Sequence, residues 1–220
     1  MKDIDNIIHI NGDQPIVDQI RAAVAVLRKG GVVVFPTSGL YGLGSDAFDV
    51  KALERIFLIK GRDARKPILV LIDTMEMMDQ VAIKVSPMGR FLMQRLWPGR
   101  VTFVVPAAHH LPSELTGDTG KIGIRQAAHP VAVALVKTLG RPLTGTSANI
   151  SGGKGCAAIE KLDSSIQNSV DLVLDAGLLA GGPGSTVVDI TGATPRILRP
   201  GSVPTKEIMD LFHQFVAKGC

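Results

Sequence analysis

The sequence predicts an α/β protein with an open, twisted, mixed sheet and helices on both faces. Segments with helical spacing of apolar residues alternate with short β-branched runs along most of the 220 residues. Several of those runs are apolar throughout, which is typical of strands covered on both sides. The short runs near the C-terminus resemble antiparallel strands, so the sheet is expected to be mixed rather than purely parallel.

The first expected helix covers residues 16–27. Ile16, Ile20 and Val24 lie on one face of it, and Gly30-Gly31 supplies a stop. The same spacing returns further along the chain. It predicts helices at 50–57, 75–81, 87–96, 130–139 and 205–216.

The first expected strand is the β-branched run 32–35, which Pro36 closes. A glycine-rich loop is expected from Thr37 to Gly44. Further strands are predicted at 68–72, 101–105, 122–125, 143–145, 172–174, 186–190 and 196–198.

Length and composition favour one cytoplasmic domain spanning residues 1–220. No apolar run approaches the roughly 20 residues that cross a membrane, and the first residues lack the apolar core of an export signal. Two cysteines exclude a disulfide framework, and the five histidines form no helical metal-binding pair, so no metal site is expected. A net charge of +4 is compatible with binding polyphosphate or RNA.

Three loops carry groups that could bind an anion. The loop 37–44 has three glycines, the segment 60–66 has four cations and one carboxylate, and the loop 144–153 has four hydroxyls and a carboxamide. A tight connection, a solvated helix end and a surface turn are the structural alternatives. The number of hydrogen-bonding groups favours a binding cradle in 144–153. By contrast, 117–121 lacks the spacing of a phosphate loop and is expected to be a turn.

Seven short motifs in order resemble the YrdC/TsaC family of threonylcarbamoyl-AMP synthases, in its short single-domain form. They are Phe35-Pro36-Thr37 with Tyr41-Gly42-Leu43-Gly44, Lys60-Gly61-Arg62 with Lys66-Pro67, Trp97-Pro98-Gly99 with Thr102-Phe103, Ile124-Arg125, Thr146 to Gly152, Ser185 to Asp189, and Leu198 to Gly201.

The resemblance implies a reaction of L-threonine, bicarbonate or carbon dioxide, and ATP, which yields threonylcarbamoyl-AMP and pyrophosphate. A separate protein complex would then transfer the threonylcarbamoyl group to a tRNA adenosine beside the anticodon, and contact with tRNA or that complex is possible. Mg²⁺ would be carried by the ATP phosphates.

The resemblance also implies roles for individual residues. Lys60 and Arg62 would be the catalytic cations, and with Lys66 they would neutralise the phosphates and the carbamate. Arg125 would bind the threonine carboxylate with two parallel hydrogen bonds. The other expected binding residues are Thr37 and Tyr41 in the pocket wall, Ser147, Asn149, Ser151 and Arg199 around the nucleotide, and Thr186 on the amino acid.

The sequence departs from the family pattern at Gly39, Lys121, Gly145 and Gly155, where small hydroxyl residues are expected. These departures leave two other hypotheses open. One is a divergent paralogue that acts on a different carbamoyl-adenylate, as in hydrogenase-maturation carbamoyltransferases. The other is a non-catalytic RNA-binding module, although a single Trp and a single Tyr supply few surfaces for base stacking.

Overall fold

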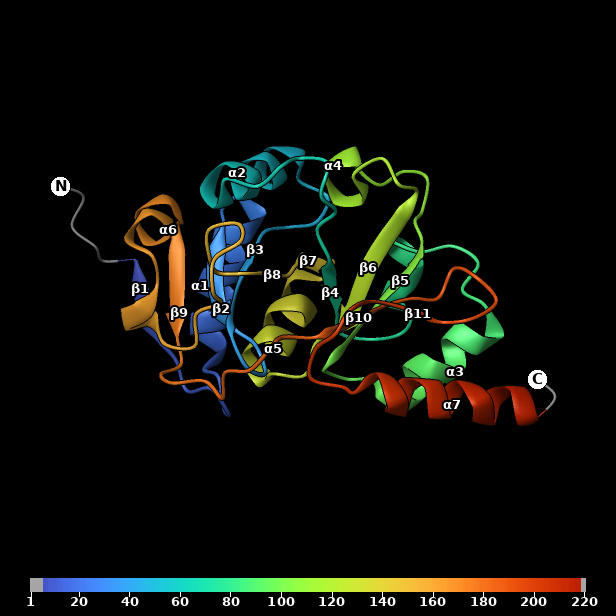
Figure 1. The fold of residues 1–220 in the computed structure, drawn as a ribbon. Coiled ribbons are helices and arrows are strands. Elements are labelled where there is room, and N and C mark those ends of the chain that lie inside the picture. The colour runs from blue at the N-terminus through green and yellow to red at the C-terminus, as the bar shows by residue number, and fades with distance from the viewer. Residues whose placement is uncertain (1–5, 219–220) are drawn as a thin grey trace.

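The computed structural model describes residues 6–218, which form two hydrogen-bonded sheets (Figure 1). The first sheet has the order β1-β9-β2-β3-β8, and the second has the order β11-β10-β5-β6-β4-β7. An isolated bridge between Asp46 and Leu143 links the two. The predicted class, α/β with open mixed strand pairing, is confirmed, but the single sheet that was expected is divided into two by the hydrogen bonding.

The first sheet combines parallel and antiparallel pairs. β9 pairs in parallel with both β1 and β2, whereas β3 pairs antiparallel with β2 and β8. Its strands are β1 (Ile7–His9), β2 (Val33–Pro36), β3 (Tyr41–Gly44), β8 (Thr146–Ser147) and β9 (Leu172–Asp175).

The second sheet has an antiparallel centre, β5 against β6, with parallel pairs on both sides. β7 and β11 add antiparallel edges. Its strands are β4 (Val70–Ile72), β5 (Val101–Pro106), β6 (Lys121–Gln126), β7 (Leu143–Thr144), β10 (Thr186–Asp189) and β11 (Arg196–Arg199).

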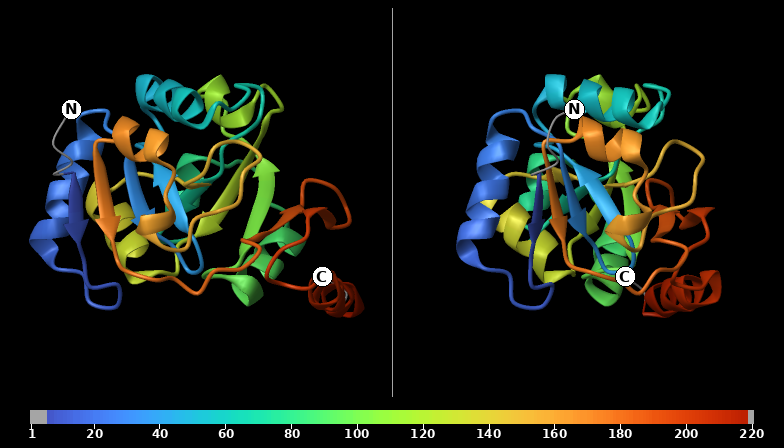
Figure 2. Two further views of the ribbon diagram at one scale, coloured as in Figure 1. Left: turned by 60° about the vertical axis from the view of Figure 1, so that its left-hand side comes forward. Right: turned by 90° about the vertical axis from the view of Figure 1, so that its left-hand side faces the viewer.

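Helices α1 and α5 pack against each other and against β2, and they lie together on one side of the strands in Figure 2. α2 packs with α4 and α6, and α3 packs with α7 beside the second sheet. The helices are α1 (Val17–Arg28), α2 (Val50–Lys60), α3 (Pro87–Leu96), α4 (Ser113–Thr116), α5 (Pro130–Leu139), α6 (Ser164–Ser169) and α7 (Thr205–Ala217), with short 3₁₀ turns η1 (Met77–Gln80) and η2 (Ile159–Lys161).

Most predicted elements form, and the differences have local causes. The helix expected at 75–81 is only the 3₁₀ turn η1, and the loop expected at 37–44 contains the buried strand β3. Gly44 in β3 has no room for a side chain, because a Cβ there would lie 2.8 Å from the Phe35 ring. In residues 6–218, no helix combines the length and the apolar character that a membrane span requires.

Candidate active site

A cleft of about 1250 Å³ lies between the two sheets. Its walls come from the β2–β3 connection, the loop after β8, the segment 180–185 and the strands of the second sheet. Among the described residues that line it, seven are cationic and one, Asp189, is a carboxylate; the cations are Arg62, Arg100, Lys121, Arg125, Lys154, Arg196 and Arg199. Such a lining attracts anions.

The cleft floor is built from alternate residues of the second sheet, because successive side chains on a strand point to opposite faces. Thr102 and Val104 of β5 face the cleft, and Val187 and Asp189 of β10 lie beside them in register. On the other side of β5, β6 contributes Lys121, Gly123 and Arg125 to the floor.

Arg125 is the cation best placed to bind a ligand. Its half-buried guanidinium lines the cleft, and no residue in 6–218 accepts a hydrogen bond from it. Burial, and then the charge of Arg199, lowers the pKa of Arg125 to about 10. The side chain still carries its charge at neutral pH, so its planar donors are available to a carboxylate or phosphate.

Arg62 and Arg199 also face the cleft, but backbone carbonyls hold them in place. Arg62 Nη2 donates to the Pro67 carbonyl at 2.9 Å, and Arg199 Nη2 donates to the Ser185 carbonyl at 2.8 Å. Burial, and then the charge of Arg199, lowers the pKa of Arg62. Both side chains keep further donors for an anion, whereas Lys66 is exposed and lies outside the cleft lining.

Lys60 ends α2 and is almost completely buried, with 1% of its surface exposed. Its ammonium donates to the backbone carbonyls of Ser147 and Asn149, the latter at 2.7 Å. Burial, and then the charge of Arg62, lowers the pKa of Lys60 to about 8. Lys60 therefore holds the end of β8 and the loop after it in position, which connects the motif Lys60-Gly61-Arg62 with the motif at 146–152.

That loop is closed by its own polar groups. The Ser147 hydroxyl hydrogen-bonds to Asn149 Oδ1, and Asn149 Nδ2 donates to the Gly153 carbonyl at 2.9 Å. The Ser151 N–H donates to the Lys60 carbonyl at 2.8 Å. Of these three polar residues only Ser147 lines the cleft, so Asn149 and Ser151 shape the loop from behind.

Two expected binding residues, Thr37 and Thr186, have their hydroxyls engaged within the protein. Thr37 Oγ1 donates to the Leu40 carbonyl at 2.6 Å, although Thr37 still lines the cleft. Thr186 is fully buried and outside the cleft lining, and its Oγ1 donates to the Val203 carbonyl at 2.7 Å. Its neighbour Ser185 lines the cleft instead, with its Oγ 2.8 Å from Thr102 Oγ1.

Tyr41 lies in the cleft wall with its hydroxyl turned toward the end of β9. The hydroxyl is 2.7 Å from the Gly177 carbonyl and 3.1 Å from Asp175 Oδ1, and it accepts from the Ala176 N–H at 2.9 Å. Burial raises the pKa of Tyr41. These contacts anchor the segment that connects the two sheets.

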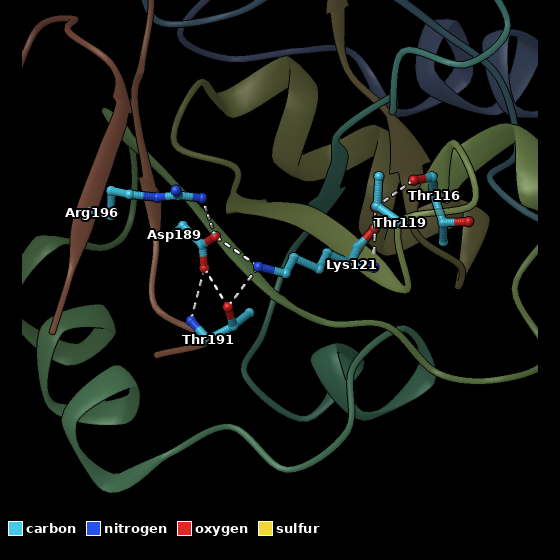
Figure 3. Close-up of polar contacts among 6 residues, drawn as sticks. All are labelled: Thr116, Thr119, Lys121, Asp189, Thr191 and Arg196. Atoms are coloured by element: carbon cyan, nitrogen blue, oxygen red, sulfur yellow. Dashed lines mark hydrogen bonds and ion pairs between the residues drawn. The ribbon is translucent and has the colours of Figure 1, made fainter. Parts of the chain in front are cut away.

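Asp189 organises a charged network at one end of the cleft floor (Figure 3). Its Oδ2 lies 2.9 Å from Lys121 Nζ and 3.3 Å from Arg196 Nη2, and its Oδ1 accepts from the Thr191 N–H and hydroxyl. Burial acts to raise the pKa of Asp189, but the hydrogen bonds from Thr191 and Lys121 outweigh it and bring that pKa to about 2. The carboxylate is therefore ionised and fully occupied.

The glycines at departures from the family pattern have close neighbours. A Cβ at Gly145 would lie 2.8 Å from the Leu71 side chain, and one at Gly155 would lie 2.6 Å from Leu40. At Gly39, a Cβ would collide with the Gly181 carbonyl oxygen. Steric fit thus accounts for these glycines. In the described part of the chain, no three His, Cys, Asp or Glu side chains gather in a group that could hold a metal ion.

A family described as telomere recombination, whose members are named Sua5, YciO and YrdC, matches residues 25–201. A protein of Mycobacterium tuberculosis is 38% identical over 192 residues, which are 87% of this chain and 88% of that protein. This chain belongs to the Sua5/YciO/YrdC family. The family match covers every strand of the two sheets except β1, and every residue of the cleft lining except Ser202.

Relatives in the Sua5/YciO/YrdC family include proteins named threonylcarbamoyl-AMP synthase. The one from Pyrococcus abyssi is 35% identical over 86% of this chain and 56% of its own length. The one from Thiobacillus denitrificans is 46% identical over 58% of this chain and 68% of its own length. The chain therefore spans about half of the Pyrococcus protein and most of the Mycobacterium protein.

Solved structures of the family have the same fold. The crystal structure of Pyrococcus abyssi Sua5 complexed with L-threonine has a TM-score of 0.88 at 33% identity, over 93% of this chain and 60% of that one. That of Escherichia coli YciO has a TM-score of 0.84 at 29% identity, over 92% and 98%. Full-length HypF, at 21% identity and a TM-score of 0.73, shares the fold.

Within this family fold, sequence reasoning missed several residues of the floor. Thr102, Ser185 and Asp189 stand inside the family motifs, but the motifs indicate no role for them. The alternation of strand residues could have identified them, because the cleft residues along β6 and β10 recur at every second position. Strand alternation applied to 121–125 and to 185–189 predicts which side chains share the face of Arg125.

Tyr41→Phe is expected to destabilise the protein by about 1–2.5 kcal/mol, because the half-buried Ala176 N–H and the Gly177 carbonyl each lose a hydrogen-bond partner. For a chain of this length, the melting temperature should fall by roughly 2–10 °C. Turnover at saturating substrates and low temperature should stay within about twofold of wild type. A large loss of turnover at an unchanged melting temperature would instead show that the hydroxyl contacts substrate.

Proposed function

We propose that the cleft binds ATP, L-threonine and bicarbonate or carbon dioxide, and joins them as threonylcarbamoyl-AMP with release of pyrophosphate. Membership of the Sua5/YciO/YrdC family, and relatives named threonylcarbamoyl-AMP synthase in Pyrococcus abyssi and Thiobacillus denitrificans, support this proposal. The observation that carries the assignment to this cleft is Arg125, which has no acceptor within residues 6–218 and, like Arg62, lies close to the charge of Arg199. One substrate has a carboxylate and the other has phosphates, and each needs a cation.

The threonine amine first adds to carbon dioxide and loses a proton to water, which gives threonine carbamate. The adenylation step then forms one bond and breaks one. A carbamate oxygen of threonine carbamate attacks the α-phosphorus of ATP, while the bond from that phosphorus to the bridging oxygen breaks and its electron pair leaves with pyrophosphate. Both reactants are anions, so cations must reduce their repulsion and align them. The seven cationic side chains of the lining provide that field.

Individual roles follow from position. Arg125 binds the threonine carboxylate, Arg62 and Arg199 bind the nucleotide phosphates, and the loop that Lys60 fixes places Ser147 at the nucleotide. Lys66 and Lys154 add charge at the rim. Asn149 and Ser151 act by shaping the loop, and Thr186 acts by supporting β10.

Mg²⁺ fits this cleft as a companion of ATP rather than as a protein-bound ion. Asp189 is the single carboxylate in the described lining, and Lys121, Arg196 and Thr191 already occupy it. Phosphate oxygens and water would complete the ion's coordination, and its charge would offset that of the phosphates. The reaction belongs in the cytoplasm, where a separate transferase would use the product to modify tRNA.

Pyrophosphate release is expected to require threonine and bicarbonate together, because neither alone forms the carbamate nucleophile. The assay measures pyrophosphate from Mg·ATP in buffer freed of carbon dioxide, with each component added singly and then jointly. Release at an equal rate from ATP with bicarbonate alone would contradict the mechanism. Tight, selective tRNA binding without any ATP turnover would favour the RNA-binding module instead.

A further inference from the structure

The floor beside Arg125 has an unusual gap. Lys121, Gly123 and Arg125 are alternate residues of β6 and all line the cleft. A Cβ at Gly123 would lie 3.3 Å from the Thr102 side chain and from Leu69 Cβ, so a side chain there would crowd both. The gap leaves open floor between two cations, and Val104 and Val187 supply its apolar surface.

Asp189 and Thr191 fix the ammonium of Lys121 (Figure 3). It donates to Asp189 Oδ2 at 2.9 Å and to Thr191 Oγ1 at 2.8 Å. A protonated lysine has three donors and no acceptor. Two are used within the protein and one remains, while 38% of the side chain stays exposed.

The strand register places Asp189, which holds the Lys121 ammonium, two residues along the sheet from the row of Val187, Thr102 and Arg125. Asp189 is two residues beyond Val187, and two residues of strand span about 7 Å. Val187 lies in register with Thr102, and Thr102 and Arg125 flank the paired residues Phe103 and Ile124. A carboxylate bound at Arg125 would thus place a β-substituent toward Lys121, over Val104 and Val187.

We propose that Lys121 donates its free N–H to the side-chain hydroxyl of the amino-acid substrate and so selects neutral hydroxy amino acids of threonine's size. This inference rests on the proposed function and deepens it. Asp189 is a positioning residue, since its carboxylate aims the Lys121 ammonium and offsets its charge. Arg196, bound to the same carboxylate oxygen, keeps Asp189 in place.

Comparison of threonine with valine tests the proposal, since valine has nearly the same shape and lacks the hydroxyl. We measure kcat/KM for both amino acids in wild type and in Lys121→Met. The variant should lower the threonine-to-valine ratio by roughly 10- to 100-fold, because one hydrogen bond from a charged donor is lost. The value of kcat/KM for threonine should fall, and the value for valine should stay nearly unchanged.

Matched variants distinguish selection of the substrate's hydroxyl from a general effect of removing a cation from the cleft. Lys154→Met removes another cation from the cleft lining and should leave the ratio unchanged. Asp189→Asn should lower the ratio as Lys121→Met does, and Lys121→Arg should restore part of it. These readouts are ratios within one folded variant, so loss of stability alone does not produce them.

An unchanged ratio in Lys121→Met would overturn the proposal, as would a wild-type preference for aspartate over threonine. If wild type shows no turnover with any amino acid, the proposed function fails, and melting temperatures still decide on Lys121. Threonine should then raise the wild-type melting temperature more than valine does, and Lys121→Met should abolish the difference. Equal shifts in wild type would refute the role of Lys121.

Discussion

Arg125→Ala is expected to lower kcat/KM for threonine by roughly 100- to 1000-fold, because the threonine carboxylate would lose its bidentate partner. The loss should appear mainly as a higher KM for the amino acid. Arg125→Lys keeps a charge without the planar fork and should recover only part of the activity. Steady-state kinetics with the concentration of threonine varied at saturating ATP and bicarbonate would measure both effects.

Stability provides the control for this prediction. The Arg125 guanidinium has no acceptor in residues 6–218, and burial and Arg199 both disfavour its charge. Removing it should therefore leave the melting temperature of the substrate-free protein unchanged or slightly higher. Threonine should no longer stabilise the variant. A large fall in melting temperature, with normal KM, would mean that Arg125 supports the fold rather than the substrate.

Lys60→Met is expected to damage both folding and catalysis. The Ser147 and Asn149 carbonyls would each lose a charged donor, at a cost of about 1–3 kcal/mol apiece. For a chain of this length, the melting temperature should fall by roughly 4–24 °C. Turnover of the folded fraction should fall by roughly 100- to 1000-fold. The segment that carries Ser147 would lose its anchor, and the cleft would lose a nearby cation.

Arg62→Ala is the matched comparison, since Arg62 lies two residues away and lines the cleft itself. Turnover should fall by a similar factor, but the melting temperature should change little because only two bonds to backbone carbonyls of a loop are lost. Thermal melting and turnover at saturating ATP, threonine and bicarbonate distinguish the two variants. Near-normal turnover in both would remove the support that these cations give to the synthase assignment.

Sequence patterns predicted the helices better than the sheets. α3 and α5 begin and end at the expected residues, since Pro87 and Pro130 open them and their apolar spacing is regular. β3 was missed because two of its four residues are glycines, which usually indicate a loop. Here Gly42 and Gly44 let β3 pass close to the Phe35 ring, a tertiary contact that no local pattern contains.

The sequence motifs predicted which segments form the candidate site more reliably than which polar atoms face the cleft. The motifs assigned Arg62, Arg125, Ser147 and Arg199 to one site. In the structure, all four line the same cleft. The motifs did not indicate that the polar groups of Lys60 and Tyr41 hydrogen-bond to the backbone. They also did not indicate that Ser185, rather than Thr186, faces the cleft. Those facts depend on strand register and on loops distant in sequence, so they required the three-dimensional structure.

The identity of the product tests the central claim most directly. The protein would be incubated with Mg·ATP, threonine and ¹³C-labelled bicarbonate, and the nucleotides analysed by mass spectrometry. We predict an adenylate that contains both threonine and the label, formed in step with pyrophosphate. A threonyl-adenylate without the label, or hydrolysis of ATP to ADP alone, would contradict the assignment of this cleft to threonylcarbamoyl-AMP synthesis.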